Sequence, residues 1–141
     1  MLLLPACAAA EPPTLQVEDP WVRAAPPGAA ALAAYATLRN PGAGPLVVRP
    51  CPSAGFAAVS LHQTTHDDGV ARMRPLQQLE LQPQESVALA PGGMHLMLEA
   101  PQAQAQVGQK LGVCLSVDGF ESTFEFQVRR ATVEAHRHQH H

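Results

Sequence analysis

The sequence predicts an all-β domain, a sandwich or barrel of about eight to nine short strands. The 141 residues include fourteen prolines and ten glycines, which interrupt regular structure and leave little room for long helices. Between these turn residues, short apolar and β-branched runs recur at roughly even spacing, as is typical of sandwiches and barrels. The hydrophobic fraction of 46% is sufficient for one packed core in a chain of this length.

In the N-terminal half, the strand candidates are residues 14–18, 21–25, 29–40, 45–49 and 56–63. Asp19-Pro20 divides the first two. Residues 29–40 are rich in alanine, and propensity alone would favour a helix there. However, large and small side chains alternate from Ala34 to Leu38, and a turn at Asn40-Pro41-Gly42 follows. We therefore predict a strand in this segment.

In the C-terminal half, the strand candidates are residues 70–74, 76–81, 86–90, 94–99, 110–117 and 122–128. The turns between them are predicted at Asp67-Asp68-Gly69, Pro91-Gly92-Gly93 and Asp118-Gly119, because these residue types favour tight turns and hairpins. We assign residues 14–128 to the β-domain. Residues 1–13 are interpreted as a signal remnant or flexible arm, and residues 129–141 as a histidine-rich flexible tail.

Charge and hydropathy exclude several classes of partner. The formal net charge is −3, and there is no block of lysine and arginine. We therefore expect no nucleic-acid partner and no binding to anionic membrane surfaces. No stretch approaches the roughly 20 apolar residues that a membrane-spanning helix needs.

The chain begins with MLLLPACAAA, which looks like the end of an export signal. The basic leader and longer apolar stretch of a full signal are missing. Leu4-Pro5-Ala6-Cys7 loosely resembles a lipoprotein box in which Cys7 would carry the lipid, although proline is unusual at that place. We expect a periplasmic or other extracytoplasmic protein, with a lipid anchor at Cys7 as one alternative.

The three cysteines are Cys7, Cys51 and Cys114. None lies at a CxxC spacing, which excludes a zinc ribbon or a thioredoxin-type motif. In an exported protein, Cys51 and Cys114 could form a disulfide and leave Cys7 unpaired. They could equally be two independent core residues, and the sequence leaves both alternatives open.

Histidine and methionine interleave in the middle of the chain. The alternating residues are His62, Met73, His95 and Met97, here called the His/Met set. In the strand expected at 94–99, His95 and Met97 project from the same face because they are two residues apart. The opposite face carries Met94, Leu96 and Leu98 and is the natural core side. His95 and Met97 are therefore expected on the outer face.

His62 and Met73 flank the turn at residues 67–69, so we expect the whole set to converge at one end of the sandwich. Imidazole and thioether together favour a soft metal, since thioethers bind Cu(I) well and Zn²⁺ or Mg²⁺ poorly. Thioethers also form no disulfides, which suits an oxidising compartment. A single methionine in a β-domain is usually core filler, and it is the joint spacing that favours a Cu(I) site.

The spacing His-x10-Met-x21-His-x-Met is the signature of the periplasmic copper chaperone family written PCu(A)C, which the chain resembles over residues 14–128. Further similarity lies at residues 21–28, 35–41, 68–75 and 91–98. The resemblance implies a cupredoxin-like, Greek-key β-sandwich or barrel, with the His/Met set as the Cu(I) ligands. It also implies a carrier without enzymatic activity that delivers Cu(I) to the dinuclear copper centre of cytochrome c oxidase or to an assembly factor. We expect the carrier to be a monomer.

Further histidines are candidates for secondary metal sites. Some members of the family have a methionine soon after the first histidine, but here Gln63, Thr64 and Thr65 follow. His66 can substitute for that methionine, or it is a solvated turn residue. A second cluster comprises His136, His138, His140 and His141. Such histidines bind Cu(II), Ni²⁺ or Zn²⁺, although an expression-tag remnant is the other interpretation.

Four other functions compete with copper delivery. A blue-copper electron carrier needs a cysteine ligand with histidine and methionine nearby, but Cys114 is followed by Leu-Ser-Val. A hydrolase is disfavoured because no nucleophile elbow, HExxH, P-loop or GxGxxG is present. A metal-independent structural or adhesion sandwich, or a copper storage or scavenging protein, remains an alternative.

Overall fold

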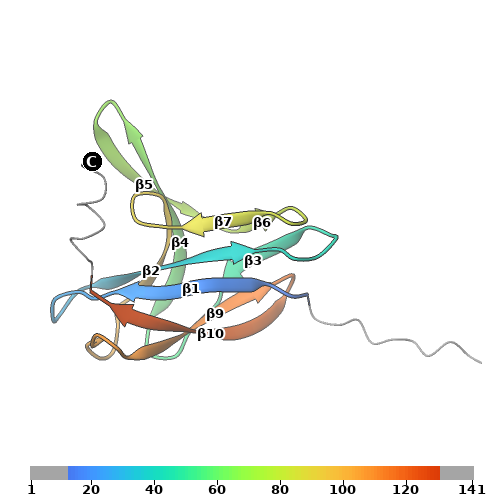
Figure 1. Cartoon of the computed structure of the whole chain (residues 1–141). Helices are drawn as coiled ribbons and strands as arrows, with labels where there is room; N and C mark the ends of the chain where they lie inside the picture. Colours follow the sequence, from blue (N-terminus) through green and yellow to red (C-terminus); the bar gives the residue numbers. More distant parts are fainter. Residues whose placement is uncertain (1–12, 131–141) are drawn as a thin grey trace, which may run out of the picture.

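The computed structural model describes residues 13–130, which form ten β-strands (Figure 1). The strands are β1 (Gln16–Arg23), β2 (Ala31–Arg39), β3 (Leu46–Pro50), β4 (Ala58–Asp67), β5 (Val70–Leu76), β6 (Leu79–Leu81), β7 (Ser86–Leu89), β8 (Met94–Glu99), β9 (Lys110–Val117) and β10 (Phe120–Arg129). Within residues 13–130, no helix is long and apolar enough to cross a membrane. The prediction of an all-β domain is confirmed.

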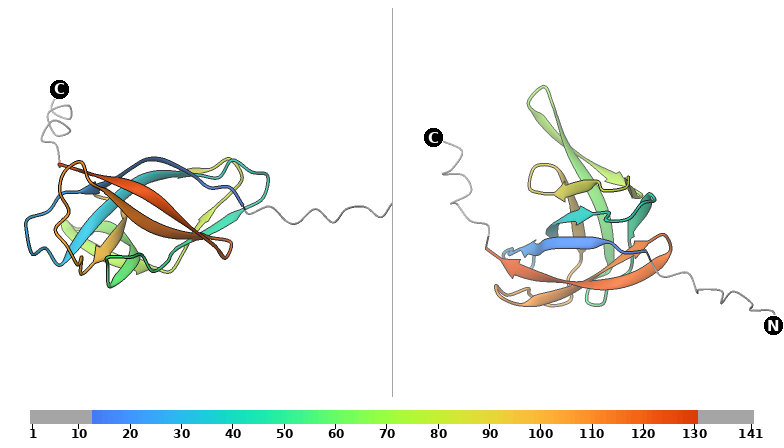
Figure 2. Two further views of the ribbon diagram at one scale, coloured as in Figure 1. Left: turned by 90° about the horizontal axis from the view of Figure 1, so that it is seen from below. Right: turned by 45° about the vertical axis from the view of Figure 1, so that its right-hand side comes forward.

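All ten strands belong to one sheet, in the order β5-β4-β8-β2-β1-β10-β9-β3-β6, with β7 paired to β2 beside β8. Neighbouring strands are antiparallel except β1 and β10, which run parallel. The sheet is not closed, so that β5 and β6 form its two edges. It curves around a single core (Figure 2).

The core is built from alternate residues of the strands. Leu96 and Leu98 of β8 are 1% and 0% exposed, and Phe126 and Val128 of β10 are equally buried. Met94 packs against this cluster from the same face of β8. The face predicted for the core side of β8 is therefore confirmed, and it turns His95 and Met97 to the opposite side of the sheet.

The segments around Asp19-Pro20 form one strand and not the two that the sequence predicts. β1 continues through this dipeptide, and its pairing with β2 shifts register between Glu18 and Trp21. Asp19 has a φ of 48°, as is typical of a residue that accommodates a bulge. Conversely, the run predicted as one strand at residues 76–81 is divided between β5 and β6.

The hairpin of β4 and β5 projects beyond the rest of the sheet (Figure 1). Its two-residue turn is Asp68-Gly69, with φ values of 50° and 78°. Positive φ at both positions matches the right-handed twist of the flanking strands. Pairing then continues without interruption from Asp67↔Val70 to Leu61↔Leu76. The hairpin thus extends one sheet edge as a long two-stranded arm.

Cys51 and Cys114 form a disulfide, which resolves the alternative left open by the sequence. Their Cα atoms are 5.1 Å apart. The Ser53 hydroxyl accepts a hydrogen bond from the backbone N–H of Cys114 at 2.8 Å and donates one to the carbonyl of Cys51 at 3.2 Å. The disulfide therefore links the segment after β3 to β9. Cys7 lies outside the described residues.

Candidate metal centre

The His/Met set lies on three neighbouring strands, β5, β4 and β8, and on one face of the sheet. His62 of β4 is the direct cross-strand partner of His95 on β8, and Ser60 is the partner of Met97. On the other side of β4, Thr64 is the partner of Met73 on β5. Directly paired residues share a face, and Ser60, His62 and Thr64 alternate along one face of β4. The register alone therefore places all four side chains on the outer face.

This placement differs in one respect from the expected convergence at an end of the sandwich. His62 and Met73 lie within β4 and β5, as the strands predicted at residues 56–63 and 70–74 imply, but the candidate centre lies along the strands and not at the turn between them. The reason is that the β4–β5 turn occupies only two residues, so that strand pairing continues past both ligands. The candidate centre is a patch on the surface of the sheet, next to its β5 edge.

The two histidines form the middle of the patch. Their ring centroids are 5.9 Å apart and the ring planes are 18° from parallel. His95 is 6% exposed, whereas His62 is half-buried. The ring centroid of Tyr35 lies 6.5 Å from that of His95, and the ring of Trp21 packs against Tyr35 in a tilted arrangement, with centroids 4.7 Å apart. This aromatic row, running across β1, β2, β8 and β4, restricts the rotamer of His95.

Hydrogen bonds leave one nitrogen of each imidazole free. Nδ1 of His95 lies 3.2 Å from the carbonyl oxygen of Gly93. Because a carbonyl only accepts, Nδ1 is the donor and Nε2 keeps its lone pair. Nε2 of His62 lies 2.8 Å from the Ser60 hydroxyl, whereas Nδ1 is buried and has no partner among the described residues. Nδ1 of His62 is therefore the ring nitrogen that is left free for a metal ion.

The two methionines flank the histidine pair along the strands. Met97 is half-buried and follows His95 by two positions on β8, whereas Met73 is 55% exposed on the edge strand β5. The backbones of β5 and β8 are separated by two strand spacings, about 10 Å. His62, His95 and Met97 are therefore grouped by the sheet itself, whereas Met73 must fold across from the edge.

The donor set fits a soft monovalent cation. Two imidazoles and two thioethers carry no negative charge, and thioethers favour Cu(I) over harder divalent ions. The arrangement can hold such an ion at the surface of the sheet, with Met73 as the most exposed donor.

The remaining histidines differ in placement. His66 is exposed on the same face of β4, near the end of the hairpin, opposite Ala71. It lies diagonally across from Met73 on β5, at the periphery of the candidate metal centre. The tail histidines His136, His138, His140 and His141 lie outside the described residues.

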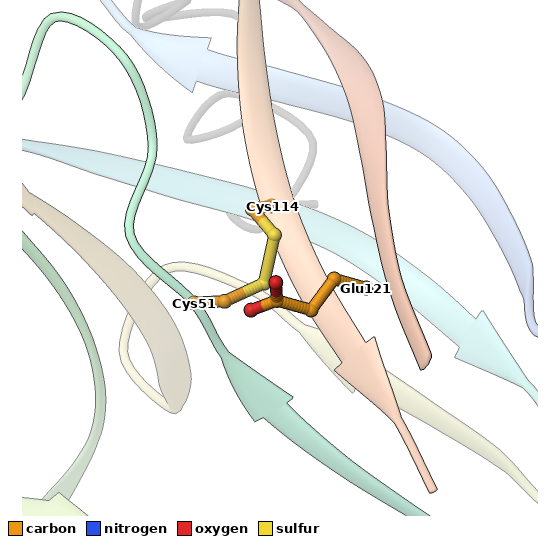
Figure 3. A group of neighbouring side chains, drawn as sticks. All are labelled: Cys51, Cys114 and Glu121. Carbon is orange, nitrogen blue, oxygen red and sulfur yellow. A yellow bond between two sulfur atoms is a disulfide. The ribbon is translucent and has the colours of Figure 1, made fainter. Parts of the chain in front are cut away.

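A second cluster of metal-binding residue types comprises Cys51, Cys114 and Glu121, whose donor atoms lie within 4.8 Å of one another (Figure 3). The two sulfur atoms are bonded to each other, so that neither is a thiolate. Because a cysteine binds metal as the thiolate, this group is a structural cross-link beside an exposed carboxylate.

Sequence reasoning missed Ser60 and Tyr35, which contact the histidines, and also Glu99 and Trp21, which contact Ser60 and Tyr35 in turn. The Ser60 hydroxyl lies 3.4 Å from Oε2 of Glu99 in addition to its contact with His62. Ser60 is two residues before His62, and Glu99 is two residues after Met97, so strand periodicity places each on the face of its neighbouring ligand. Only the pairing of β4 with β8 shows that the two meet.

Comparisons with known proteins agree with this architecture. A family described as "Putative lipoprotein LpqE-like" matches residues 15–129. The "Putative lipoprotein Lxx21020" of Leifsonia xyli subsp. xyli (strain CTCB07) is 32% identical over 102 residues, which are 72% of this chain and 60% of that protein. The match thus spans less than two thirds of the curated relative.

Two solved structures with bound copper have a similar fold. The "Copper-bound PCuAC domain from PmoF2" is 25% identical with a TM-score of 0.65, over 82% of this chain and 92% of that one. The solution structure of "CuI-DR1885" from Deinococcus radiodurans is 27% identical with a TM-score of 0.66, over 89% and 84%.

The described residues thus have the fold of a PCuAC domain, and the predicted resemblance to that family is confirmed. The chain belongs to the LpqE-like family.

Proposed function

We propose that this protein is an extracytoplasmic copper chaperone that binds one Cu(I) ion and transfers it to an acceptor protein. The ligands in this proposal are His62, Met73, His95 and Met97. The observation that supports it most strongly is the register, which places all four on one face of three adjacent strands. The copper bound in two domains of similar fold supports the choice of metal.

The four ligands differ in exposure, and transfer of the copper ion would begin at the most exposed one. Met73 lies on the edge strand and is 55% exposed, so a donor from an acceptor can approach the copper ion from that side. A thioether is uncharged and need not be protonated to leave, so exchange one ligand at a time is expected. His95, packed against Tyr35, would be the last ligand to leave. A carrier of this kind performs no bond-breaking chemistry and is not an enzyme.

The acceptor in this proposal is the dinuclear copper centre of cytochrome c oxidase or an assembly factor that serves it. The chaperone would act as a monomer and without nucleic acid. The lipoprotein character of the family and of the curated relative supports an extracytoplasmic, periplasmic location, with a lipid anchor at Cys7 as the means of attachment. The tail histidines at 136, 138, 140 and 141 would bind Cu(II) in a secondary site, with His66 as a further peripheral ligand.

The experiment is an anaerobic competition titration of the purified protein against a coloured Cu(I) chelator. We expect a 1:1 complex at sub-micromolar strength. Met97→Leu should weaken Cu(I) binding at least about tenfold, since even changes outside the ligand shell cost 10–100-fold at metal sites. Met94→Leu is the matched control, because Met94 lies on the same strand but packs on the core face.

X-ray absorption on the Cu(I) form separates the proposal from its alternatives. We expect two nitrogen and two sulfur neighbours, one sulfur fewer in Met97→Leu, and no change in Met94→Leu. An adhesion sandwich would show no stoichiometric complex. A storage or scavenging protein would bind Cu(I) but retain it when mixed with the copper-free copper domain of the oxidase, a result that would contradict delivery.

A further inference from the structure

A chain of polar contacts runs along the edge of the candidate metal centre. The Ser60 hydroxyl lies 2.8 Å from Nε2 of His62 and 3.4 Å from Oε2 of Glu99. Ser60 is directly opposite Met97 in the β4–β8 pairing, and Glu99 is opposite Ala58. The three side chains therefore share the outer face of two adjacent strands, and the serine stands between the carboxylate and the imidazole.

The chemistry of the three groups determines which of them donates in each hydrogen bond. A carboxylate only accepts hydrogen bonds, so in the contact with Glu99 the serine is the donor. A serine hydroxyl has a single hydrogen, so in its contact with His62 the serine accepts. Nε2 of His62 is therefore the protonated nitrogen, and Nδ1 carries the lone pair.

The surroundings of Nδ1 agree with this tautomer. This atom is buried and has no hydrogen-bond partner among the described residues. A hydrogen on Nδ1 would be a donor buried without an acceptor, which is unfavourable. A lone pair at the same place would be satisfied by a soft cation, so that metal binding would give the buried nitrogen its partner.

We propose that Ser60, oriented by Glu99, is a positioning residue that holds His62 in the Nε2–H tautomer, so that His62 binds Cu(I) through Nδ1. His95, whose Nδ1 donates to Gly93, binds through the other nitrogen, Nε2. The two stacked rings thus present opposite nitrogens to one ion. The inference rests on the proposed copper-binding function and adds the role of two residues outside the His/Met set.

The first test needs no copper. Long-range ¹H–¹⁵N spectra of the copper-free, full-length protein at mildly alkaline pH distinguish the protonated from the unprotonated nitrogen of each imidazole. We expect His62 to be protonated at Nε2 and His95 at Nδ1. Ser60→Ala should move His62 to a mixture of tautomers and leave His95 unchanged. Ser60→Thr, which keeps the hydroxyl, should restore the wild-type pattern.

Glu99→Gln tests the direction of these hydrogen bonds while keeping the serine. The amide can donate as well as accept, so the serine is no longer forced to accept from His62, and a partial shift toward the other tautomer is expected. Ser122→Ala, on an exposed part of β10, is the control and should change neither histidine. If wild-type His62 is protonated at Nδ1, or if Ser60→Ala leaves its tautomer unchanged, the inference is wrong.

The second test adds Cu(I) and separates this inference from the proposed function. We expect the ¹⁵N signals of His62 Nδ1 and His95 Nε2 to shift, and Ser60→Ala to weaken Cu(I) binding about 10–100-fold, the usual effect of losing the partner of a metal-binding histidine. If copper binds but shifts Nε2 of His62, the positioning role is refuted while the chaperone function holds. If wild type binds no Cu(I), the proposed function fails whatever the tautomers show.

Discussion

The disulfide allows a quantitative prediction about stability. Cys51 and Cys114 are 63 positions apart, and the loop they close contains the strands β4 to β8 with the whole His/Met set. In the chain-entropy description, closing a loop of this length destabilises the unfolded state by about 4 kcal/mol at 25 °C. The double variant Cys51→Ala/Cys114→Ala should therefore lose about 4 kcal/mol in its free energy of unfolding.

The assay is equilibrium unfolding in urea, followed by the fluorescence of the single tryptophan, Trp21, and by far-ultraviolet circular dichroism. Wild type unfolded with a phosphine reductant present provides a second measurement, because reduction opens the loop but keeps both sulfur atoms. The two losses should agree to within about 1 kcal/mol, the scale of small packing changes. The Cu(I) affinity of the folded variant should stay unchanged, because β9 is four strands from β8 in the sheet.

A loss of less than about 1 kcal/mol in both measurements would refute the loop-closure reasoning, because the predicted value is several times larger. A loss in the alanine variant alone would instead assign the stabilisation to the packing of the buried sulfurs. Coincidence of the two spectroscopic transitions is the check that a two-state free energy is defined.

Three further predictions follow from particular contacts. A methyl group at Gly112 would lie 2.9 Å from Cγ2 of Thr123, so Gly112→Ala should lower the free energy of unfolding in urea by about 1–3 kcal/mol. Thr123→Ser removes that methyl group and should recover part of the loss in the Gly112→Ala background. Full additivity of the two substitutions would contradict the clash. Asn40 is 1% exposed and donates to the carbonyl of Leu81 at 3.0 Å, so Asn40→Ala should cost about 1–3 kcal/mol, whereas a cost near zero would show that water replaces the amide. Because Met73 is the most exposed ligand and lies on an edge strand, Cu(I) should slow hydrogen exchange of the β5 amides more than those of β8; equal protection of both strands would show that Met73 does not close on the copper ion.

Local patterns accounted for most of the strands and for the choice of candidate ligands. Alternation and tight turns predicted the hairpins at Asp68-Gly69 and Asp118-Gly119, and both dipeptides adopt the positive φ values that such turns require. Alternation within β8 also separated the core face from the His95 face, because that property depends only on the two-residue period of a strand. The failures at Asp19-Pro20 and at the β5–β6 boundary arose where pairing with a neighbouring strand outweighed the local signal.

Residue types and spacing along the chain were enough to select histidine and methionine side chains suited to a soft metal, because ligand preference is a property of the donor atoms. Only the tertiary structure decided that His62 faces His95 and that Ser60 meets Glu99. It also decided that Cys51 bonds to Cys114. These contacts join segments more than thirty residues apart, and their distances depend on how the entire sheet pairs and curves, which no local pattern contains.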